Sequence, residues 1–394
     1  MGRQNRTPGV WPYQVVMGVA TASVAGIVAL LGELREELGL SSTAIGLVVS
    51  AGFLAAFVAQ ITLAPFADRG HARRMIGAGL AMAVVGLAAM TVVDSVALLT
   101  ASRALIGFGA GLVMPGLRRA VSVIDAERVG ENLGRLIVGE VAGYLAGPVG
   151  AGALAAVGGV RLPFAVFAAG LVLFIPLALR LPPDTGRKDP SAGRLAFDLL
   201  RIRRLQGALV LIAGYFVVIG AFESVVPVMF HERGASALAT GLAFTSFTLP
   251  ILLVSPRAGR LADRVGAARV ASIGIFVVAV TSAFYGILPG YIWPAVLMGV
   301  AGVADGFGFT GAQVAVSRAV PEERQAAALG LMGATEVAAA GLAAAPAAVL
   351  FAAVGAAWSW VILAAVSVAI VGVAQLLFRG TEPTANPQPE PLRM

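Results

Sequence analysis

The sequence predicts an all-α integral membrane protein in which twelve transmembrane helices form two pseudo-symmetric six-helix bundles. Of its 394 residues, 58% are hydrophobic and 12% are charged, and the mean hydropathy is +0.89. Soluble domains carry about 25% charged residues, so this composition indicates a chain that lies within lipid. A polar motif near residue 68 returns near residue 263. A repeat at about half the chain length indicates two similar halves.

Twelve apolar segments are long enough to cross a membrane. A helix needs about 20 apolar residues to span a hydrocarbon core of roughly 30 Å. The expected spans are 12–34, 42–66, 75–93, 96–117, 131–157, 160–181, 207–231, 237–258, 269–288, 291–316, 326–353 and 356–378. The boundary between the fifth and sixth spans depends on Gly158 and Gly159, so this pair is the most open to recounting.

A polar, basic segment divides the spans into two sets of six. We expect an N-terminal bundle at 1–181, a cytoplasmic basic linker at 182–206, a C-terminal bundle at 207–378 and a disordered cytoplasmic tail at 379–394. Arginines gather on alternate loops, on the same side as this linker. Because basic loops stay in the cytoplasm, both termini are expected there. The expected location is the cell membrane, inner or plasma, with the chain crossing it many times.

Charge and cysteine content exclude several functions. The net charge of +7 comes from loop arginines that read as topology signals, so we expect no nucleic-acid partner. The chain has no cysteine, which removes disulfides and thiolate metal sites, and we expect no metal and no cofactor. Lys188 does not belong to a phosphate-binding loop, and no hydrolase motif is present. The expected partners are the lipid bilayer, protons and a small-molecule substrate, and the expected state is a monomer.

The repeated polar motif lies on the connections after the second and eighth spans. Its two copies contain Asp68, Arg69, Arg73 and Arg74, and then Asp263 and Arg264. An aspartate at a helix end beside arginines can hold neighbouring helices together by charge-assisted contacts. Breaking such contacts would shift the balance between inward-open and outward-open states. The alternative is that these residues serve only as inside-positive anchors.

The repeat extends to other segments of the two halves. Gly107-Phe108-Gly109 and Arg119-Ala120-Val121 return as Gly306-Phe307-Gly308 and Arg318-Ala319-Val320. Glu140-Val141-Ala142 returns as Glu336-Val337-Ala338. Matched glycines and alanines arise easily by chance in so alanine-rich a chain. Two glutamates at matched positions inside predicted spans are much stronger evidence for the repeat.

Two six-helix halves in parallel repeat, joined by a basic linker, resemble the major facilitator superfamily. Its loop signature, Gly-x-Leu-Ala-Asp-Arg-x-Gly followed by two basic residues, is similar to the segment from Gly259 to Gly266, although Ala267 and Ala268 replace the basic pair. The first copy departs further, because Ala64 replaces the leading glycine and the second glycine comes one place early, at Gly70.

Two helix motifs support this resemblance. The family's Arg-x-x-x-Gly pattern on helix four matches Arg103 and Gly107. Its glycine-rich pattern on helix five, with Ala151 in place of one glycine, matches Gly143, Gly147, Pro148 and Gly152. In the family the second pattern is associated with drug:proton antiporters, so the resemblance implies export. Small residues of this kind also occur in ordinary helix packing, which remains an alternative.

Ionisable residues inside the predicted spans are the candidates for proton coupling. They are Arg103, Glu140, Glu223, Asp305 and Glu336. An unpaired charge at such depth costs several kcal/mol, so Arg103 requires a partner. The resemblance implies that helices one, four, seven and ten line the cavity, which would bring Arg103, Glu223 and Asp305 to one pathway. Asp305 is the first candidate and Glu223 the second, whereas Glu140 and Glu336 are equally open to a structural role.

The sequence therefore predicts a secondary active transporter and not an enzyme. The leading hypothesis is proton-coupled efflux of small amphipathic or drug-like molecules by alternating access. The alternative is a major facilitator permease for uptake or efflux of a metabolite such as a sugar or an amino acid.

Overall fold

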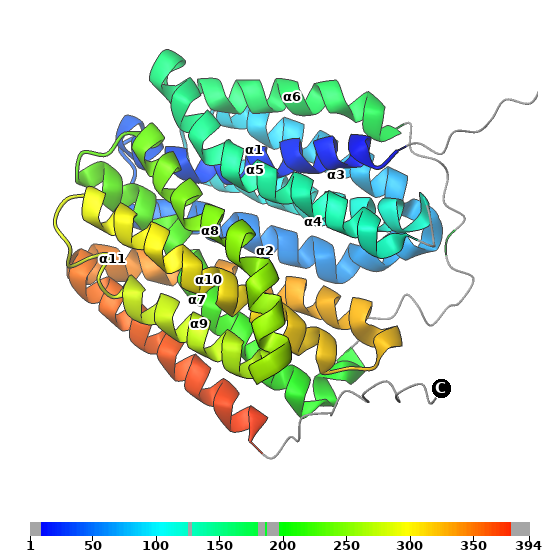
Figure 1. The fold of residues 1–394 in the computed structure, drawn as a ribbon. Coiled ribbons are helices and arrows are strands. Elements are labelled where there is room, and N and C mark those ends of the chain that lie inside the picture. The colour runs from blue at the N-terminus through cyan, green and yellow to red at the C-terminus, as the bar shows by residue number, and fades with distance from the viewer. Residues whose placement is uncertain (1–8, 125–127, 180–185, 187–196, 380–394) are drawn as a thin grey trace, which may run out of the picture.

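The protein is described here from a computed structural model, which covers residues 9–124, 128–179, 186 and 197–379 (Figure 1). Most of the expected linker and nearly all of the expected tail lie outside these residues. The first half contains α1 (Trp11–Glu37), α2 (Ser42–Phe66), a π-helical turn (Ala67–His71), α3 (Ala72–Met90), α4 (Val96–Ile124), α5 (Val129–Gly158) and α6 (Leu162–Leu179). The second half contains a 3₁₀ turn (Phe197–Arg201), α7 (Arg203–Glu232), α8 (Ala237–Val265), α9 (Ala267–Ser282), α10 (Ile292–Arg318), a further turn (Glu322–Arg324) and α11 (Gln325–Phe378).

Most helix ends lie within three residues of the expected spans. α4 and α8 each run seven residues further than expected, to Ile124 and Val265, and three other differences occur. α7 begins at Arg203 instead of residue 207, because its first turn includes the basic residues assigned to the linker. α9 ends at Ser282 instead of residue 288, and irregular turns follow it. α11 runs through the last two expected spans, but Gly355, with φ 75° and ψ 177°, breaks the helix between them.

Eight helical stretches among the described residues are long and apolar enough to cross a membrane. Two shorter apolar helices, Leu162–Leu177 and Ala267–Ser282, accompany them. Two of the eight stretches, Ser42–Met90 and Ala327–Phe378, contain the chain reversals at Gly70 and Gly355. The expected count of twelve spans is therefore not reproduced by length and composition alone.

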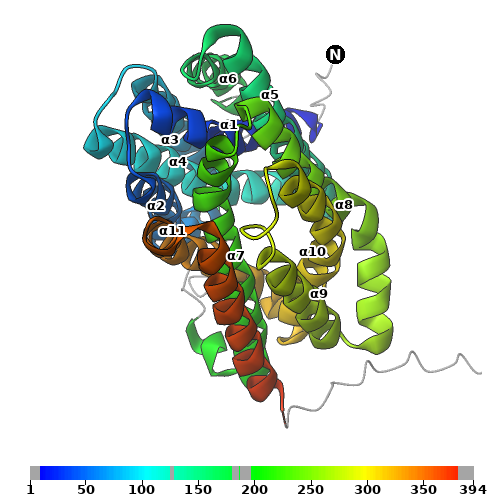
Figure 2. The same cartoon turned by 90° about the vertical axis from the view of Figure 1, so that its left-hand side faces the viewer.

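The helices of each half pack mainly against one another. α1 contacts α5, and α2 and α3 contact α4; in the second half α7 contacts α11, and α8 and α9 contact α10. Figure 1 shows α1 to α6, coloured from blue to green, on one side and α7 to α11, coloured from green to red, on the other. Figure 2 shows α11 running beside α7. The halves meet where α1 contacts α7, α2 contacts α11 and α5 contacts α8.

Each helix reverses the direction of the one before, so the connections lie at two opposite ends of the bundle. We call the end that carries the turn at 67–71 and the turn at Gly266 the motif face. We call the other end, where α1 and α7 finish, the Arg35 face. Gly70 (φ 84°) and Gly266 (φ 98°) adopt the left-handed backbone that glycine enters without steric cost. The early glycine of the first motif copy therefore still forms a turn.

Candidate functional site

Three glutamates from both halves lie within electrostatic range of Tyr144. Glu140 lies one turn before Tyr144 on α5, while Glu223 belongs to α7 and Glu336 to α11. The charges of all three carboxylates act on the Tyr144 hydroxyl. Tyr144 lies in the middle of α5, yet its side chain is 40% exposed, so its ring faces an opening. We call Glu140, Tyr144, Glu223 and Glu336 the central acid cluster.

Two arginines of α4 partly neutralise this cluster. Arg118 forms a 3.8 Å ion pair with Glu140, and its charge also acts on Glu336. Arg103 is only 3% exposed, and the charge of Glu223 acts on it. The buried Arg103 and the half-buried Glu223 therefore lie within electrostatic range of each other. Three carboxylates face two guanidinium groups here.

The Arg103 motif has a simple packing basis. A Cβ atom added at Gly52 of α2 would lie 2.9 Å from Nε of Arg103. A Cβ added at Gly107, one turn after Arg103, would lie 2.6 Å from the carbonyl carbon of Gly52. The two glycines therefore let α2 and α4 approach until the Arg103 side chain lies flat against α2.

Asp305 lies apart from the central acid cluster. It is completely buried on α10, and neither carboxylate oxygen has a hydrogen-bond partner among the described residues. The Tyr215 hydroxyl of α7 lies within electrostatic range of both Asp305 and Glu336. The structure thus brings Arg103 and Glu223 within electrostatic range of each other, whereas Asp305 interacts with Tyr215.

The two polar motifs form equivalent contacts at the motif face. Asp68 lies 3.7 Å from Arg119 at the end of α4, and Asp263 forms an ion pair with Arg318 at the end of α10. Arg119 and Arg318 occupy matched positions in the sequence repeat. Arg69 lies over the ring of Phe66, 5.1 Å from its centroid. The remaining motif arginines are exposed: Arg73, Arg74 and Arg264.

The glycine-rich motif of α5 serves two different contacts. Gly143 and Gly147 face α1, where added Cβ atoms would lie 2.8 Å from Cβ of Thr21 and 2.5 Å from the carbonyl oxygen of Ala22. Gly152 faces the other half, where a Cβ would lie 2.5 Å from Cα of Leu238.

Pro148 also belongs to the contact between the halves. Its carbonyl group lies against Gly241 of α8. Close by, Thr245 of α8 donates a 2.8 Å hydrogen bond to the carbonyl of Leu145. The first half of the motif therefore packs within one bundle, and the second half joins α5 to α8.

Charged side chains join the two halves at the Arg35 face. Arg35 of α1 forms a 2.7 Å ion pair with Glu232 of α7, and Glu36 pairs with His231. Glu33 accepts a 2.7 Å hydrogen bond from the N–H of Ala237, in the first turn of α8. A carboxylate is favourable at that helix end because of the helix dipole.

The pairs of α1 and α7 are reciprocal. Arg35 and His231 are separated by 196 residues, as are Glu36 and Glu232. The basic residue of each repeat therefore binds the acidic residue of the other. No motif predicts this contact, although the shared offset of 196 residues is a signal for it in the sequence.

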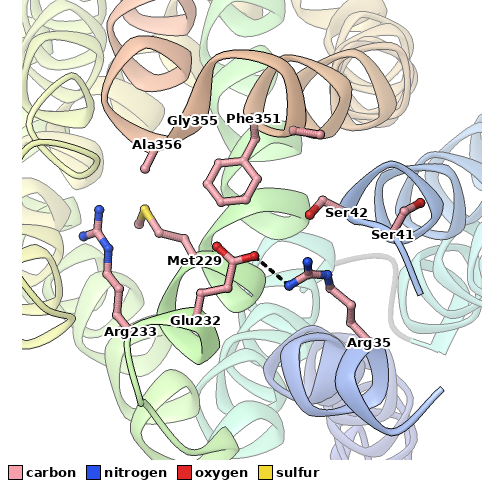
Figure 3. Close-up of a pocket in the computed structure, with 10 residues that line it drawn as sticks. Arg35, Ser41, Ser42, Met229, Glu232, Arg233, Phe351, Gly355 and Ala356 are labelled. Carbon is pink, nitrogen blue, oxygen red and sulfur yellow. Dashed lines mark hydrogen bonds and ion pairs between the residues drawn. The ribbon is translucent and has the colours of Figure 1, made fainter. Parts of the chain in front are cut away.

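A pocket of about 440 Å³ lies beside these pairs, between the two halves (Figure 3). Its wall includes Arg35 and Ser42 from the first half, and Glu232, Arg233 and Phe351 from the second. The Arg233 guanidinium donates hydrogen bonds of 2.8–3.1 Å to the carbonyls of Tyr285, Gly286, Leu288 and Gly290. Burial lowers the pKa of Arg233, and the charge of Glu232 opposes that effect. Arg233 thus fixes the α9–α10 connection at this face.

Arg161 ties together three connections of the first half. It donates hydrogen bonds to Asp94, to Glu37 at 2.9 Å and to the carbonyl of Thr91 at 3.1 Å. The hydrogen bonds to Asp94 and Glu37 raise the pKa of Arg161. At the Arg35 face, Arg161 therefore holds the connections of the first half together, as Arg233 holds the α9–α10 connection of the second half.

The sequence of this chain matches the model of a known protein family in both halves. The model of the Major Facilitator Superfamily matches residues 15–233 and again 208–394, so each half matches by itself. The chain belongs to the Major Facilitator Superfamily. It is accordingly a multi-pass membrane protein and a transporter.

Curated relatives of this major facilitator protein include multidrug resistance proteins. The multidrug resistance proteins MdtG of Proteus mirabilis (strain HI4320) and Dickeya zeae (strain Ech586) are 27% identical over 248 residues and 30% identical over 250 residues. These matches cover 59% and 60% of this chain, and 61% and 59% of the relatives. The chain thus spans about three fifths of the MdtG relatives it matches. The uncharacterized transporter YebQ of Escherichia coli (strain K12) is 24% identical over 388 residues, covering 81% of this chain and 84% of YebQ.

Solved structures of other transporters have the same fold. A POT family transporter in complex with a thioalcohol-conjugated peptide gives a TM-score of 0.77 at 16% identity, covering 94% of this chain and 96% of that one. The nucleoside transporter NupG gives 0.73 at 16% identity, covering 94% and 99%. At these identities the likeness concerns the fold alone.

Proposed function

We propose that this major facilitator protein exports small amphipathic cations in exchange for protons. The observation that carries the proposal is the central acid cluster, in which three carboxylates from both halves face two arginines around one accessible aromatic ring. The names of the MdtG relatives and the glycine-rich motif of α5 support export of drug-like molecules.

The cluster has the chemistry to bind an organic cation. An aromatic face attracts a cation within about 6 Å of its centroid, and Tyr144 offers such a face beside Glu140. With every carboxylate ionised, the three acids and two arginines carry a net charge of −1. A charge at this depth is costly unless it is compensated. One proton or one monovalent cation supplies that compensation, so binding of one favours release of the other.

Asp305 acts as a second proton site in this proposal. It is fully buried and forms no ion pair among the described residues. Tyr215 lies within electrostatic range of both Asp305 and Glu336, and its hydroxyl would pass a proton between them. The exchange of bound proton and substrate would then take place at Glu336, while Asp305 remains shielded.

Alternating access requires the contacts of the Arg35 face to separate. In this proposal the twelve spans arise by dividing Ser42–Met90 at Gly70 and Ala327–Phe378 at Gly355, and by counting the two shorter helices. They form the bundles 1–181 and 207–378 of a monomer. The motif face and both termini lie in the cytoplasm, and the membrane is the bacterial inner membrane. The pairs of Asp68 and Asp263 would then adjust the balance between the two open states.

Transport in reconstituted vesicles tests the proposal. The lipophilic cation tetraphenylphosphonium should accumulate when a proton gradient is imposed, and Glu336→Gln should lower the rate at least tenfold, the equivalent of about 1.4 kcal/mol. Glu131→Gln is the matched control, because Glu131 lies on α5 outside the cluster and pairs with Arg135. Equal gradient-driven rates in both variants would contradict the role of Glu336. Movement of neutral metabolites, but of no cation, would favour the permease alternative.

A further inference from the structure

A serine of one half is inserted into a helix of the other. Ser50 of α2 is buried, and its hydroxyl donates a 2.7 Å hydrogen bond to the carbonyl of Gly341 on α11. The same hydroxyl accepts a 2.8 Å hydrogen bond from the N–H of Ala345. In an uninterrupted α-helix, the N–H of Ala345 would bond to the carbonyl of Gly341. The Ser50 hydroxyl therefore lies at the point where these two groups of one turn would meet.

This turn of α11 is weakened by its own sequence. Pro346 follows Ala345 and has no N–H to offer to the carbonyl of Leu342. A side chain that enters the hydrogen-bond ladder and a proline are both recognised causes of helix kinks. The two causes occur here at adjacent residues, so the conformation of the Gly341–Pro346 turn depends on what occupies it.

The inserted hydroxyl belongs to a close contact between the halves. Gly46, Ser50 and Leu54 lie four residues apart, on one face of α2. A Cβ added at Gly46 would lie 3.0 Å from the carbonyl oxygen of Ala344, and one added at Gly341 would lie 2.9 Å from Cγ of Leu54. These contacts lie in the part of α2 nearest the Arg35 face. Ser50 can therefore reach the Gly341 turn only while the two halves are joined at this face.

We propose that Ser50 couples closure of the Arg35 face to the position of Glu336. Glu336 precedes Gly341 by five residues on the same helix. When the halves separate, the Ser50 hydroxyl leaves the turn and the N–H of Ala345 bonds directly to Gly341. The bend of α11 changes, and the segment that carries Glu336 moves relative to Tyr144. Only the consequence for transport rests on the proposed exchange of protons and cations.

Closure of the Arg35 face can be measured without substrate. Spin labels at Leu47→Cys and Val349→Cys lie on exposed positions of α2 and α11, and the chain has no other cysteine. Double electron–electron resonance should show the population with separated labels rising at least threefold in Ser50→Ala, about 0.65 kcal/mol. Ser367→Ala is the control, because Ser367 also donates a buried interhelical hydrogen bond, but within the second half. Distance distributions that match between Ser50→Ala, Ser367→Ala and the parent would overturn the proposal.

The effect of Ser50 on Glu336 can be measured separately, by following the protonation of the Glu336 carboxyl group. Infrared difference titration follows protonated carboxyl groups, and the band lost in Glu336→Gln identifies this residue. The pH midpoint of that band should differ from the parent by at least half a unit in Ser50→Ala, about 0.7 kcal/mol. The groups that face Glu336 remain the same in these variants, namely Arg118, Glu140, Tyr144 and Tyr215. An unchanged midpoint would overturn the coupling.

Neither readout requires transport. If Ser50→Ala changes both readouts and no cation drives proton movement, the coupling by Ser50 stands and the proposed function fails. If a cation is exchanged for protons and Ser50→Ala leaves both readouts unchanged, the proposed function stands and the coupling fails.

Discussion

At the scale of single residues, Arg103 depends on a neighbour from the other half. It is buried on α4, and the charge of Glu223 on α7 acts on it. Removing one member of a buried pair leaves an uncompensated charge, which typically costs 3–5 kcal/mol. We therefore expect Arg103→Gln to lower the free energy of unfolding in detergent by about 3 kcal/mol.

The double variant Arg103→Gln with Glu223→Gln is the control for this prediction. It removes both charges, so it should be more stable than Arg103→Gln alone. Thermal unfolding of the purified proteins measures the difference. A double variant as unstable as the sum of the two single variants would show that the two charges do not interact.

Gly107 offers a second prediction at this scale. A methyl group there would meet the backbone of Gly52, which cannot rotate away. Gly107→Ala should therefore lower the stability by about 1–3 kcal/mol, the typical cost of overpacking. At Gly330 on α11 an added Cβ meets nothing within 4 Å, so Gly330→Ala should be neutral or stabilising. Melting temperatures of the two variants distinguish the cases, and equal effects would contradict the close α2–α4 contact.

At the scale of helices, α5 separates packing within a half from packing between halves. Gly143→Ala would disturb α1, whereas Gly152→Ala would disturb the backbone of α8. Both variants should lose about 1–3 kcal/mol of stability, but only Gly152→Ala should favour opening of the Arg35 face. Distances between spin labels on α5 and α8 measure that opening. An equal opening in Gly143→Ala would mean that the motif acts as one unit.

The sequence predicts where these helices lie along the chain, but it does not predict which helices and side chains contact one another. The apolar spans expected from hydropathy overlap the long helices of the described residues, and the weak break expected at Gly158 and Gly159 coincides with the end of α5. The repeat also matched Asp68 with Asp263 and Arg119 with Arg318, but no pattern in either segment says that they pair in space. Asp305 was ranked first because it lies near the middle of its span. Its complete burial depends on helix rotation, which an apolar helix with little amphipathicity does not reveal.

Ser50 illustrates a second reason why contacts between helices cannot be predicted from this sequence. A serine in a membrane helix commonly bonds to its own backbone one turn earlier, as Ser224 does here. Its insertion into α11 depends on the approach of two helices almost 300 residues apart in the chain. Neither α2 nor α11 contains a local signal for that approach beyond small residues.

At the scale of the whole molecule, reciprocal ion pairs hold the Arg35 face closed. Exposed ion pairs are individually worth about 0–1 kcal/mol, but Arg35–Glu232 and Glu36–His231 act together across one interface. We expect Arg35→Glu to increase the open population severalfold. The charge-swapped variant Arg35→Glu with Glu232→Arg should restore closure. Arg135→Glu, which disturbs a pair within α5, should have no effect, and distances between spin labels on α1 and α7 would measure all three.

Proton release on substrate binding tests the central claim most directly, namely that a proton and an organic cation compete for the central acid cluster. Tetraphenylphosphonium is added to the purified protein in a weakly buffered solution that contains a pH-sensitive dye. We expect protons to be released in proportion to the cation bound, with less release in Glu336→Gln and unchanged release in Glu131→Gln. Binding of the cation, measured by calorimetry, without proton release at any pH at which the protein stays folded would contradict the claim.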